Sequence, residues 1–571
     1  PGQRRRRLSS VIGRSPVNDD ALGRTTLYDW VDKDGLREPS RIVDPLGQQS
    51  RYSYDQDMQL VSAIDPMGRE TRFQYDARGE LTSAVDPSGQ STQFSFAPKE
   101  NPTVVSHGAG QDTVVVFDGA RMGEPTEVRD PKGNLTAVTY DARGNAVQVR
   151  DALGNATSLG YDIFGHVTEV RDALGQTSTF RYSAADGSLT EVGDPLGRTT
   201  RMSRDALGRP TDVTDPKSKL TAFQYAPAGE LTRVTDAMNG VTTYGYRTGR
   251  HGRFLEKVVD AERQASQLGT TLGYDVVGRL TSVTNALGQS SSVNYDLKGR
   301  PITATTRNGH TLTFGYDDLD RLTSLTAPEG AVTFAYDAAN NVTRATKYDG
   351  SAVDTVYDRL DRAVQVTQTL PNGHQVTLGY TLDANGNRAS MTTPWGTFTY
   401  AHDAMDRVTR VTNPFGQTVT FAYDALGRRT RMSYPNGTQT SYAYDPAGQI
   451  SQVLHQKLSD QSAIWFTNYS YDPAGNRPAI TDADGSHTFT YDDLHRLTAA
   501  NHGPTSVLPT KAETFAHDKV GNRTADALRT GYAYDAANRL QSDSKYTYTT
   551  DAEGNTTSRT EIATGQGFPR A

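Results

Sequence analysis

The residues of this sequence best suited to chemistry are aspartates that recur in Asp-Pro-x-Gly segments. Asp44, Asp65 and Asp86 each begin such a segment, and 17 residues separate one segment from the next. Two carboxylates held close together would split their pKa values and supply one acid and one base, as an aspartyl protease requires. The spacing is also the period of a repeat that runs along the chain, so we interpret these aspartates as turn residues. We predict no catalytic residue.

Histidines and acidic turns are the other candidates for chemistry. The chain has 11 His, without a His-x-x-x-His or His-Glu spacing, so we expect them to be solvated or packed within the fold. Segments 383–387 and 482–485 resemble calcium loops but lack the Glu at position twelve, which favours structural turns. Neither a phosphate-binding loop nor a nucleophile elbow occurs in its expected context. We therefore predict no cofactor, no metal and no enzyme activity in this segment. The histidines in or beside turns are His310, His374, His487 and His495.

Composition excludes several classes of protein. Without Cys there is no disulfide framework, thiolate metal site or cysteine nucleophile. The sequence has no run of 18 apolar residues, so we expect no membrane span. A net charge of −7 argues against a nucleic-acid partner. The one basic cluster, Arg4–Arg7, is interpreted as part of a solvated N-terminal tail over residues 1–16. Because the chain starts with Pro1, we expect a processed piece or an excerpt.

A repeat of about 21 residues runs through the whole chain. Its core is Tyr-Asp-x-x-Gly, and successive copies from Tyr274 onward begin 21, 21, 20 and 21 residues apart. Hydrophobic residues make up only 35% of the chain, which is low for several domains with thick cores. We predict one continuous array over residues 17–557, of about 27 units, followed by a tail at 558–571. Complete copies of the core are Tyr75, Asp76 and Gly79; Tyr140, Asp141 and Gly144; Tyr161, Asp162 and Gly165; Tyr274, Asp275 and Gly278; Tyr295, Asp296 and Gly299; Tyr423, Asp424 and Gly427; Tyr444, Asp445 and Gly448; and Tyr471, Asp472 and Gly475.

Each unit predicts a β-hairpin. Segment Thr311–Tyr316 is a β-branched and aromatic run with Phe314 and Tyr316 on one face. In the turn that follows most copies of the motif Tyr, Gly permits a positive φ and Asp can accept a backbone hydrogen bond. A second turn, Asp-Pro-x-Gly, leads to the next hairpin. Leu322 and Leu325 lie three apart and cannot share a face of a regular strand. Either a bulge intervenes or both faces of the sheet are partly covered.

The number of strands predicts the architecture. About 27 hairpins supply roughly 50 strands, whereas open sheets rarely exceed about 10 before they curl. We therefore predict an all-β fold in which antiparallel hairpins wind into a spiral shell one sheet thick. A strip of this size closed as a sphere has a midline radius near about 20 Å. That interior holds fewer than roughly 100 residues, so we expect the chain to be part of a larger wall.

The recurring unit Tyr-Asp-x-x-Gly-Arg-Leu-Thr-x-Val-Thr-Asp-Pro-x-Gly resembles the YD repeat of the rearrangement hotspot (Rhs) family, over roughly residues 17–557. Related repeats occur in Tc toxin complexes, wall-associated proteins and teneurins. The resemblance implies a β-cocoon that encloses a cargo, which in bacterial polymorphic toxins is the protein's own toxic C-terminal domain. It also implies an aspartyl autoprotease in a closing segment. We expect that segment, the toxin domain and any trafficking domain to lie outside this sequence.

Insertions break the period and are candidates for contact with cargo or partners. The spacing between motif tyrosines stretches to 28 after Tyr246 and to 27 after Tyr444. The first insertion is charged, and the second contains Ile464, Trp465 and Phe466. Longer loops on a regular wall often carry contacts, although a tolerated surface loop is the alternative. We predict Ile464–Phe466 as a cargo or partner loop.

Two functions fit the resemblance. The first is a non-enzymatic shell that restrains a toxic C-terminal domain, is made in the bacterial cytoplasm and is delivered to competing cells by type VI secretion. The enclosed domain would come from the same or a separate chain. A secretion spike or adaptor and an immunity protein would bind through regions outside this segment. The alternative is a cell-surface adhesion or carbohydrate-binding array. The absence of Cys fits synthesis in a reducing cytoplasm.

Overall fold

The structure, a computed structural model, describes residues 14–15, 25–33, 35–96, 102–106, 112–117, 123–249, 252–503 and 512–569. These residues form 53 β-strands, and none of them is helical. The described part of the chain therefore has no helix long and apolar enough to cross a membrane. The basic cluster Arg4–Arg7 and most of the expected N-terminal tail lie outside the described residues.

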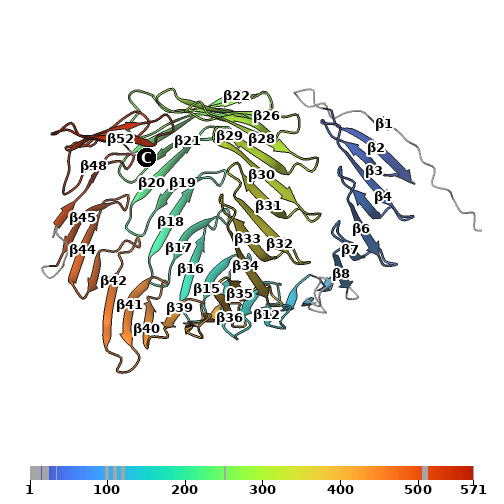
Figure 1. Ribbon diagram of the computed structural model, residues 1–571. Helices are drawn as coiled ribbons and strands as arrows, with labels where there is room; N and C mark the ends of the chain where they lie inside the picture. Colours follow the sequence, from blue (N-terminus) through green and yellow to red (C-terminus); the bar gives the residue numbers. More distant parts are fainter. Residues whose placement is uncertain are drawn as a thin grey trace, which may run out of the picture.

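Most of the chain forms one continuous antiparallel sheet. Its 46 strands run from β1 (Arg14–Ser15) to β46 (Ala512–Thr514), and each pairs with its neighbours in sequence. Figure 1 shows this strip winding as a curved wall, alternately crossing the upper and lower parts of the view. The predicted all-β spiral of hairpins is confirmed. The course of the strip can be followed through β2 (Leu27–Lys33), β12 (Leu135–Tyr140), β22 (Val241–Gly249) and β36 (Gly396–His402), and the chain then continues to β52 (Thr556–Glu561) of a smaller sheet.

The wall has almost no interior of its own. The chain exposes 32186 Å², whereas a compact protein of 62.2 kDa would expose about 20,000 Å². Among the described hydrophobic residues, those that are buried are Val259, Ala352 and Ala500. Stability must therefore come from many small contacts spread along the strip, because no thick apolar core exists.

A bulge in each hairpin resolves the spacing of Leu322 and Leu325. In strands β28 (Thr311–Tyr316) and β29 (Leu322–Ala327), Phe314 is opposite Leu325 and Tyr316 is opposite Leu322, with the register shifting between Gly315 and Tyr316. One extra residue on β29 therefore brings both leucines opposite the two aromatic rings. The same shift precedes the motif Tyr in many hairpins, including Tyr140 and Tyr423. Of the two alternatives, the bulge is the one that forms.

The motif tyrosine also joins consecutive hairpins. The pairing of β37 (Val408–Thr412) with β38 (Thr418–Tyr423) ends at Arg410 and Thr420, so Val408 has no partner residue in β38. The hydroxyl of Tyr423 donates to the carbonyl of Val408 at 2.7 Å. Tyr75 and Tyr161 make the same bond to a carbonyl 15 residues earlier. Because Phe has no hydroxyl, this bond explains why the repeat uses Tyr.

The C-terminal part of the chain differs from the prediction. Two small sheets follow β46: β47 (Ala516–His517) with β48 (Arg523–Ala525), and a five-stranded sheet from β49 (Ala533–Tyr534) to β53 (Gly567–Pro569). Strand β52 pairs with both β51 (Tyr546–Thr550) and β53. Within the predicted tail at 558–571, part of the described chain thus lies in β52 and β53. Thr556, Thr557 and Thr560 favour a strand here even though the Tyr-Asp motif is absent.

Replacing Tyr423 with Phe should weaken the hairpin locally, because it leaves a carbonyl of the wall without its hydrogen-bond donor. We expect a loss of about 1 kcal/mol, measured as roughly fivefold faster amide exchange over residues 408–423. Tyr348→Phe is the control, since Tyr348 is 59% exposed. Equal changes in exchange for both variants would contradict the role assigned to the hydroxyl.

Candidate functional site

The carboxylate of the motif aspartate organises the turn after each motif Tyr, here called the motif turn. Oδ1 of Asp424 accepts the backbone N–H groups of Leu426 at 2.9 Å and of Arg428 at 3.0 Å. Oδ2 accepts Nε of Arg428 at 2.7 Å. Gly427 adopts φ 78°, as this tight turn requires. Both carboxylate oxygens are thus engaged in holding the turn.

The arginine of the motif turn reaches the next repeat. The guanidinium of Arg428 lies 4.4 Å from the ring centroid of Tyr444. Arg407 makes the equivalent contact with Tyr423 at 4.6 Å, and its NH1 donates to the carbonyl of Asp424 at 3.3 Å. A cation over an aromatic face is attracted by the ring quadrupole. Asp, Arg and the next Tyr therefore form a ladder of polar and ring contacts along the strip.

The structure places the predicted repeat residues in equivalent positions. Each Tyr lies at or directly after the end of a strand, and each Asp begins a motif turn. The glycines of the eight complete copies have φ between 78° and 91°. Where Gly is missing, Asp320, Asn340 or His495 adopts the left-handed conformation instead. The glycines of the eight complete copies are Gly79, Gly144, Gly165, Gly278, Gly299, Gly427, Gly448 and Gly475, and the matching tyrosines and aspartates are those named in the sequence analysis.

The Asp-Pro-x-Gly aspartates occupy the second kind of turn, here called the linking turn because it connects consecutive hairpins. Oδ1 of Asp44 accepts the N–H groups of Leu46 and Gln48, each at 2.9 Å. Asp65 and Asp86 use their Oδ1 atoms in the same way. This is the turn role predicted for them. Among the described residues, no group of three or more His, Cys, Asp or Glu side chains is arranged to hold a metal ion.

Linking turns of one winding meet motif turns of the next, along a line of contacts here called the seam. Lys298, in a motif turn, lies 2.7 Å from Oδ2 of Asp44 and donates to Oε1 of Gln48 at 2.9 Å. It also pairs with Asp320 of the following motif turn. Seam hydrogen bonds join residues that are 243 to 278 positions apart. One winding therefore takes about 12 or 13 repeats, and the seam fixes its pitch.

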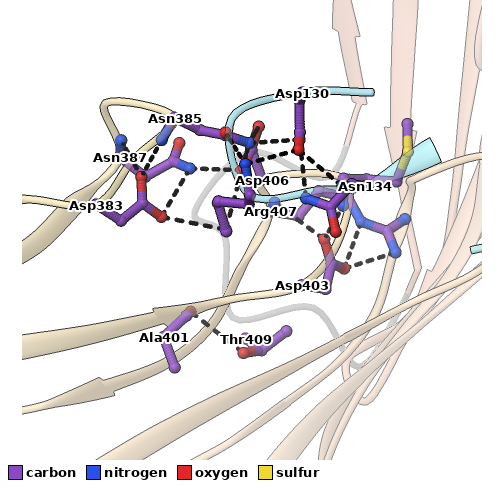
Figure 2. A network of polar contacts seen from close by, with 12 residues as sticks. Asp130, Asn134, Asp383, Asn385, Asn387, Ala401, Asp403, Asp406, Arg407 and Thr409 are labelled. Carbon is purple, nitrogen blue, oxygen red and sulfur yellow. Dashed lines mark hydrogen bonds and ion pairs between the residues drawn. The ribbon is translucent and has the colours of Figure 1, made fainter. Parts of the chain in front are cut away.

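The seam is polar and often shares one residue among several partners. Figure 2 shows Nδ2 of Asn385 donating to Oδ2 of Asp130 at 2.6 Å and to the carboxylate of Asp406. Lys132 lies 3.1 Å from Asp383 and 3.3 Å from Asp406. One linking turn thus holds two successive motif turns of the next winding. Further seam pairs are Arg69–Asn340, Arg198–Gln449, Lys217–Asp472, Lys219–Asp493, Asp215–His495, Arg263–Asp535 and Asn308–Asp551.

Family models match a large part of the wall. Residues 270–471 match the Teneurin YD-shell model, and residues 59–92, 123–156, 140–177, 182–219 and 471–503 match the RHS Repeat model. The chain belongs to the RHS/YD-repeat family. No curated protein sequence matches it.

Solved structures show which RHS/YD-repeat fold this is. The crystal structure of TcdB2-TccC3 has a TM-score of 0.74 at 14% identity and covers 96% of this chain and 38% of that one. The TcdB2-TccC3-Cdc42 structure has a TM-score of 0.73 at 14% identity and covers 96% of this chain and 40% of that one. The Photorhabdus luminescens Tc holotoxin pore has a TM-score of 0.72 at 14% identity and covers 96% of this chain and 39% of that one. The wall therefore has the β-cocoon fold of the Tc toxin shell, and it spans about two fifths of the chains it matches.

Seam contacts of the RHS wall shift the pKa values of the charged groups that make them. Burial alone would raise the pKa of Asp44, but the hydrogen bond from Lys298 and those from the backbone of Gln48 and Leu46 outweigh it, so its pKa lies below 3.8. Burial alone would lower the pKa of Lys298, but its hydrogen bonds to Asp320 and Asp44 raise it. At the other end of the seam, hydrogen bonds from Asn555 and Asn308 lower the pKa of Asp551 to about 2. Asp44 and Asp551 thus bind their partners in the ionised form.

The two insertions of the RHS wall play different parts. The first forms the long hairpin of β22 and β23 (Gly252–Val259) and the turn after it, where Arg263 lies 9% exposed and donates to the carbonyl of Asp535 at 2.8 Å. Arg263 of the charged first insertion therefore takes part in the seam. The second forms β41 (Ile450–Lys457) and β42 (Ala463–Ser470), where Ile464 is 48% and Trp465 is 44% exposed.

Phe466 is more covered than its two neighbours. These exposures leave Ile464 and Trp465 open to contact, and their role with a cargo or partner stays a prediction. Sequence reasoning missed the seam residues, because seam partners are more than 240 positions apart. The one available signal was the Lys, Arg and Gln residues at variable positions of the turns.

Replacing Lys298 with Gln should open the seam locally, since it removes the cation shared by Asp44 and Asp320. We expect a loss of about 1 kcal/mol, the upper range for a pair that is partly exposed. Amide exchange over residues 44–48 would report it, and added salt should weaken the same contact in the wild type. Lys457→Gln is the matched control because Lys457 is exposed at the end of β41. Identical exchange in both variants would contradict the seam assignment.

Acid should loosen the windings. Because the native pKa of Asp44 lies below its ordinary value of 3.8, its contribution to stability is complete above that value. The contribution is lost as the pH falls through the lower native value. Asp551, with a pKa of about 2, should keep its contacts to the lowest pH. Amide exchange measured stepwise from pH 6 to pH 2 should therefore rise at residues 44–48 before residues 306–310. The reverse order would contradict this assignment.

Proposed function

We propose that the chain forms part of the non-enzymatic encapsulating wall of a bacterial toxin. The wall encloses and restrains a toxic domain, and type VI secretion delivers the assembly to competing cells. The observation that carries the proposal is a sheet one layer thick whose successive windings are held together by the seam. Such a wall separates two volumes, which is what a container needs and what a packed domain does not provide.

The dimensions of the wall fit a container larger than this chain. About 25 strands separate seam partners, and at about 4.8 Å per strand one winding has a circumference near 120 Å. That corresponds to a midline radius of about 19 Å, and inward side chains reduce the free radius to about 13 Å. A 100-residue domain already has a radius of gyration of about 13 Å. We therefore propose that further wall contributes to the container, in line with a match to 38% of the TcdB2-TccC3 chain.

The partner in this proposal is the enclosed toxin domain, supplied by the same polypeptide or by a separate chain. The likeness to TcdB2-TccC3 assemblies supports an association with toxin components. A secretion spike or adaptor and an immunity protein would bind through other regions of the full assembly. Synthesis in the bacterial cytoplasm is consistent with the absence of Cys, since the wall needs no oxidising compartment to fold.

A cell-surface adhesion or carbohydrate-binding role is the second candidate, and the match of residues 270–471 to the Teneurin YD-shell model favours it. The two roles differ in where the ligand lies. A container holds its ligand inside the wall and protects it from protease, whereas an adhesion protein presents its binding surface outward.

Small-angle X-ray scattering of the chain tests whether it is a wall. A compact protein of 571 residues would have a radius of gyration of about 25 Å. We expect a clearly larger value and a distance distribution shifted to long vectors, because the mass lies in a curved layer. A value near that of the compact protein would contradict the container function.

Protease protection tests whether the wall encloses a cargo. We expect the chain, purified from its producing cell, to carry a polypeptide that resists trypsin while the seam is intact. The Lys298→Gln, Lys132→Gln double variant should make that polypeptide sensitive, with Lys457→Gln as the control. A co-purifying polypeptide that trypsin digests in the intact assembly would contradict enclosure.

A further inference from the structure

Two histidines face each other near the end of the large sheet. His487 in β44 (Gly485–Tyr491) and His502 in β45 (Leu497–His502) are directly opposite in the antiparallel register. Their Nδ1 atoms lie 2.9 Å apart. His487 is 7% exposed, and the side chain of His502 is 10% exposed. The pair is therefore largely shielded from water on both strands.

A carboxylate lies beyond each outer nitrogen. Nε2 of His487 is 3.2 Å from Oδ1 of Asp482, at the end of β43 (Ala479–Asp482). Nε2 of His502 is 3.7 Å from Oε2 of Glu513 in β46. Asp484, in the turn between β43 and β44, donates its N–H to the same Oδ1 of Asp482. The charged groups facing the pair from the neighbouring strands and this turn are thus acidic.

The distances fit a shared proton better than a metal ion. Two imidazoles bound to one tetrahedral zinc ion have ligand nitrogens about 3.3 Å apart, from Zn–N bonds of about 2.05 Å. The observed 2.9 Å is the usual length of a hydrogen bond between two nitrogens. The ring centroids are 5.1 Å apart, which exceeds the nitrogen separation by about two ring radii. The two Nδ1 atoms therefore point nearly head-on at each other.

Counting protons shows which state this arrangement suits. Two neutral imidazoles carry two protons, enough for both hydrogen bonds of the cluster: Nε2–H of His487 donates to Asp482, and one Nδ1–H donates to the other Nδ1. One added proton also places an N–H on Nε2 of His502 and gives the pair a positive charge beside the carboxylate of Glu513, 3.7 Å away. A second added proton places an N–H on both Nδ1 atoms, so the central bond is lost and two cations face each other.

We propose that His487 and His502 form a proton-binding site that latches β44 to β45 with one shared proton and releases them when a second proton binds. The position of the site gives the release a structural effect. Strand β45 pairs with β46 through only three residue pairs, and β46 is the last strand of the large sheet. Loss of the latch therefore frees the end of the large sheet over residues 485–503 and 512–514. This behaviour is a property of the wall itself and does not depend on what the wall encloses.

Amide exchange across the pH range in which His titrates tests the latch. Exchange over residues 485–503, corrected for the intrinsic effect of pH, is measured at pH 8, 6 and 4.5. We expect protection to be highest near pH 6 and to fall at least tenfold by pH 4.5. In the His502→Gln variant, which cannot take up the second proton at this position, the fall should be less than twofold. His374→Gln, at an exposed linking turn, should behave like the wild type.

An equal fall in the wild type and His502→Gln would overturn the proposal, and so would the absence of a fall in the wild type. Should His502→Gln not fold, ¹⁵N NMR of the wild-type chain with labelled His keeps the test open. The proposal requires the Nδ1 resonances of His487 and His502 to titrate together in two steps. Two independent one-step titrations would exclude a shared proton.

Discussion

The aspartate carboxylate that begins each motif turn is the contact on which the wall depends. One oxygen accepts two backbone N–H groups, and the other accepts the Arg or Asn four residues on, as Asp424 does with Arg428 and Asp130 analogously with Asn134 in a linking turn. This bonding fixes the turn and orients the Arg toward the Tyr of the next repeat. Because hydrogen bonds to an ionised carboxylate are stronger than neutral ones, a short turn becomes rigid without a hydrophobic core.

The same turns also connect neighbouring windings of the sheet. Hairpin pairing and the Tyr hydroxyl bond act along the strip, whereas the seam acts across it, between windings. Lys298 and Lys132 each bind two carboxylates on turns that are adjacent in space. The individual pairs are partly exposed and contribute little alone. Their repetition along the seam is what sets the pitch and holds neighbouring windings together.

A wall built in this way has no central core in which its stability is concentrated. Few side chains are buried, so a local break costs only the contacts of that turn, and the windings can separate without unfolding every hairpin. This property suits the container function that we propose for the wall. The histidine pair at His487 and His502 adds a site at the end of the large sheet where protonation acts on strand pairing directly.

Sequence alone predicted the repeat, the hairpins and the spiral shell, because each repeat is a local pattern of Tyr, Asp and Gly with a short period. It left open how Leu322 and Leu325 share a face, which the bulge at Tyr316 decides. It did not indicate the strands β52 and β53 within the predicted tail at 558–571, since these strands pair without the motif. The seam was decided only by the tertiary structure. Its partners, such as Asp44 and Lys298, meet because of the curvature of the whole sheet, and no local pattern encodes that curvature.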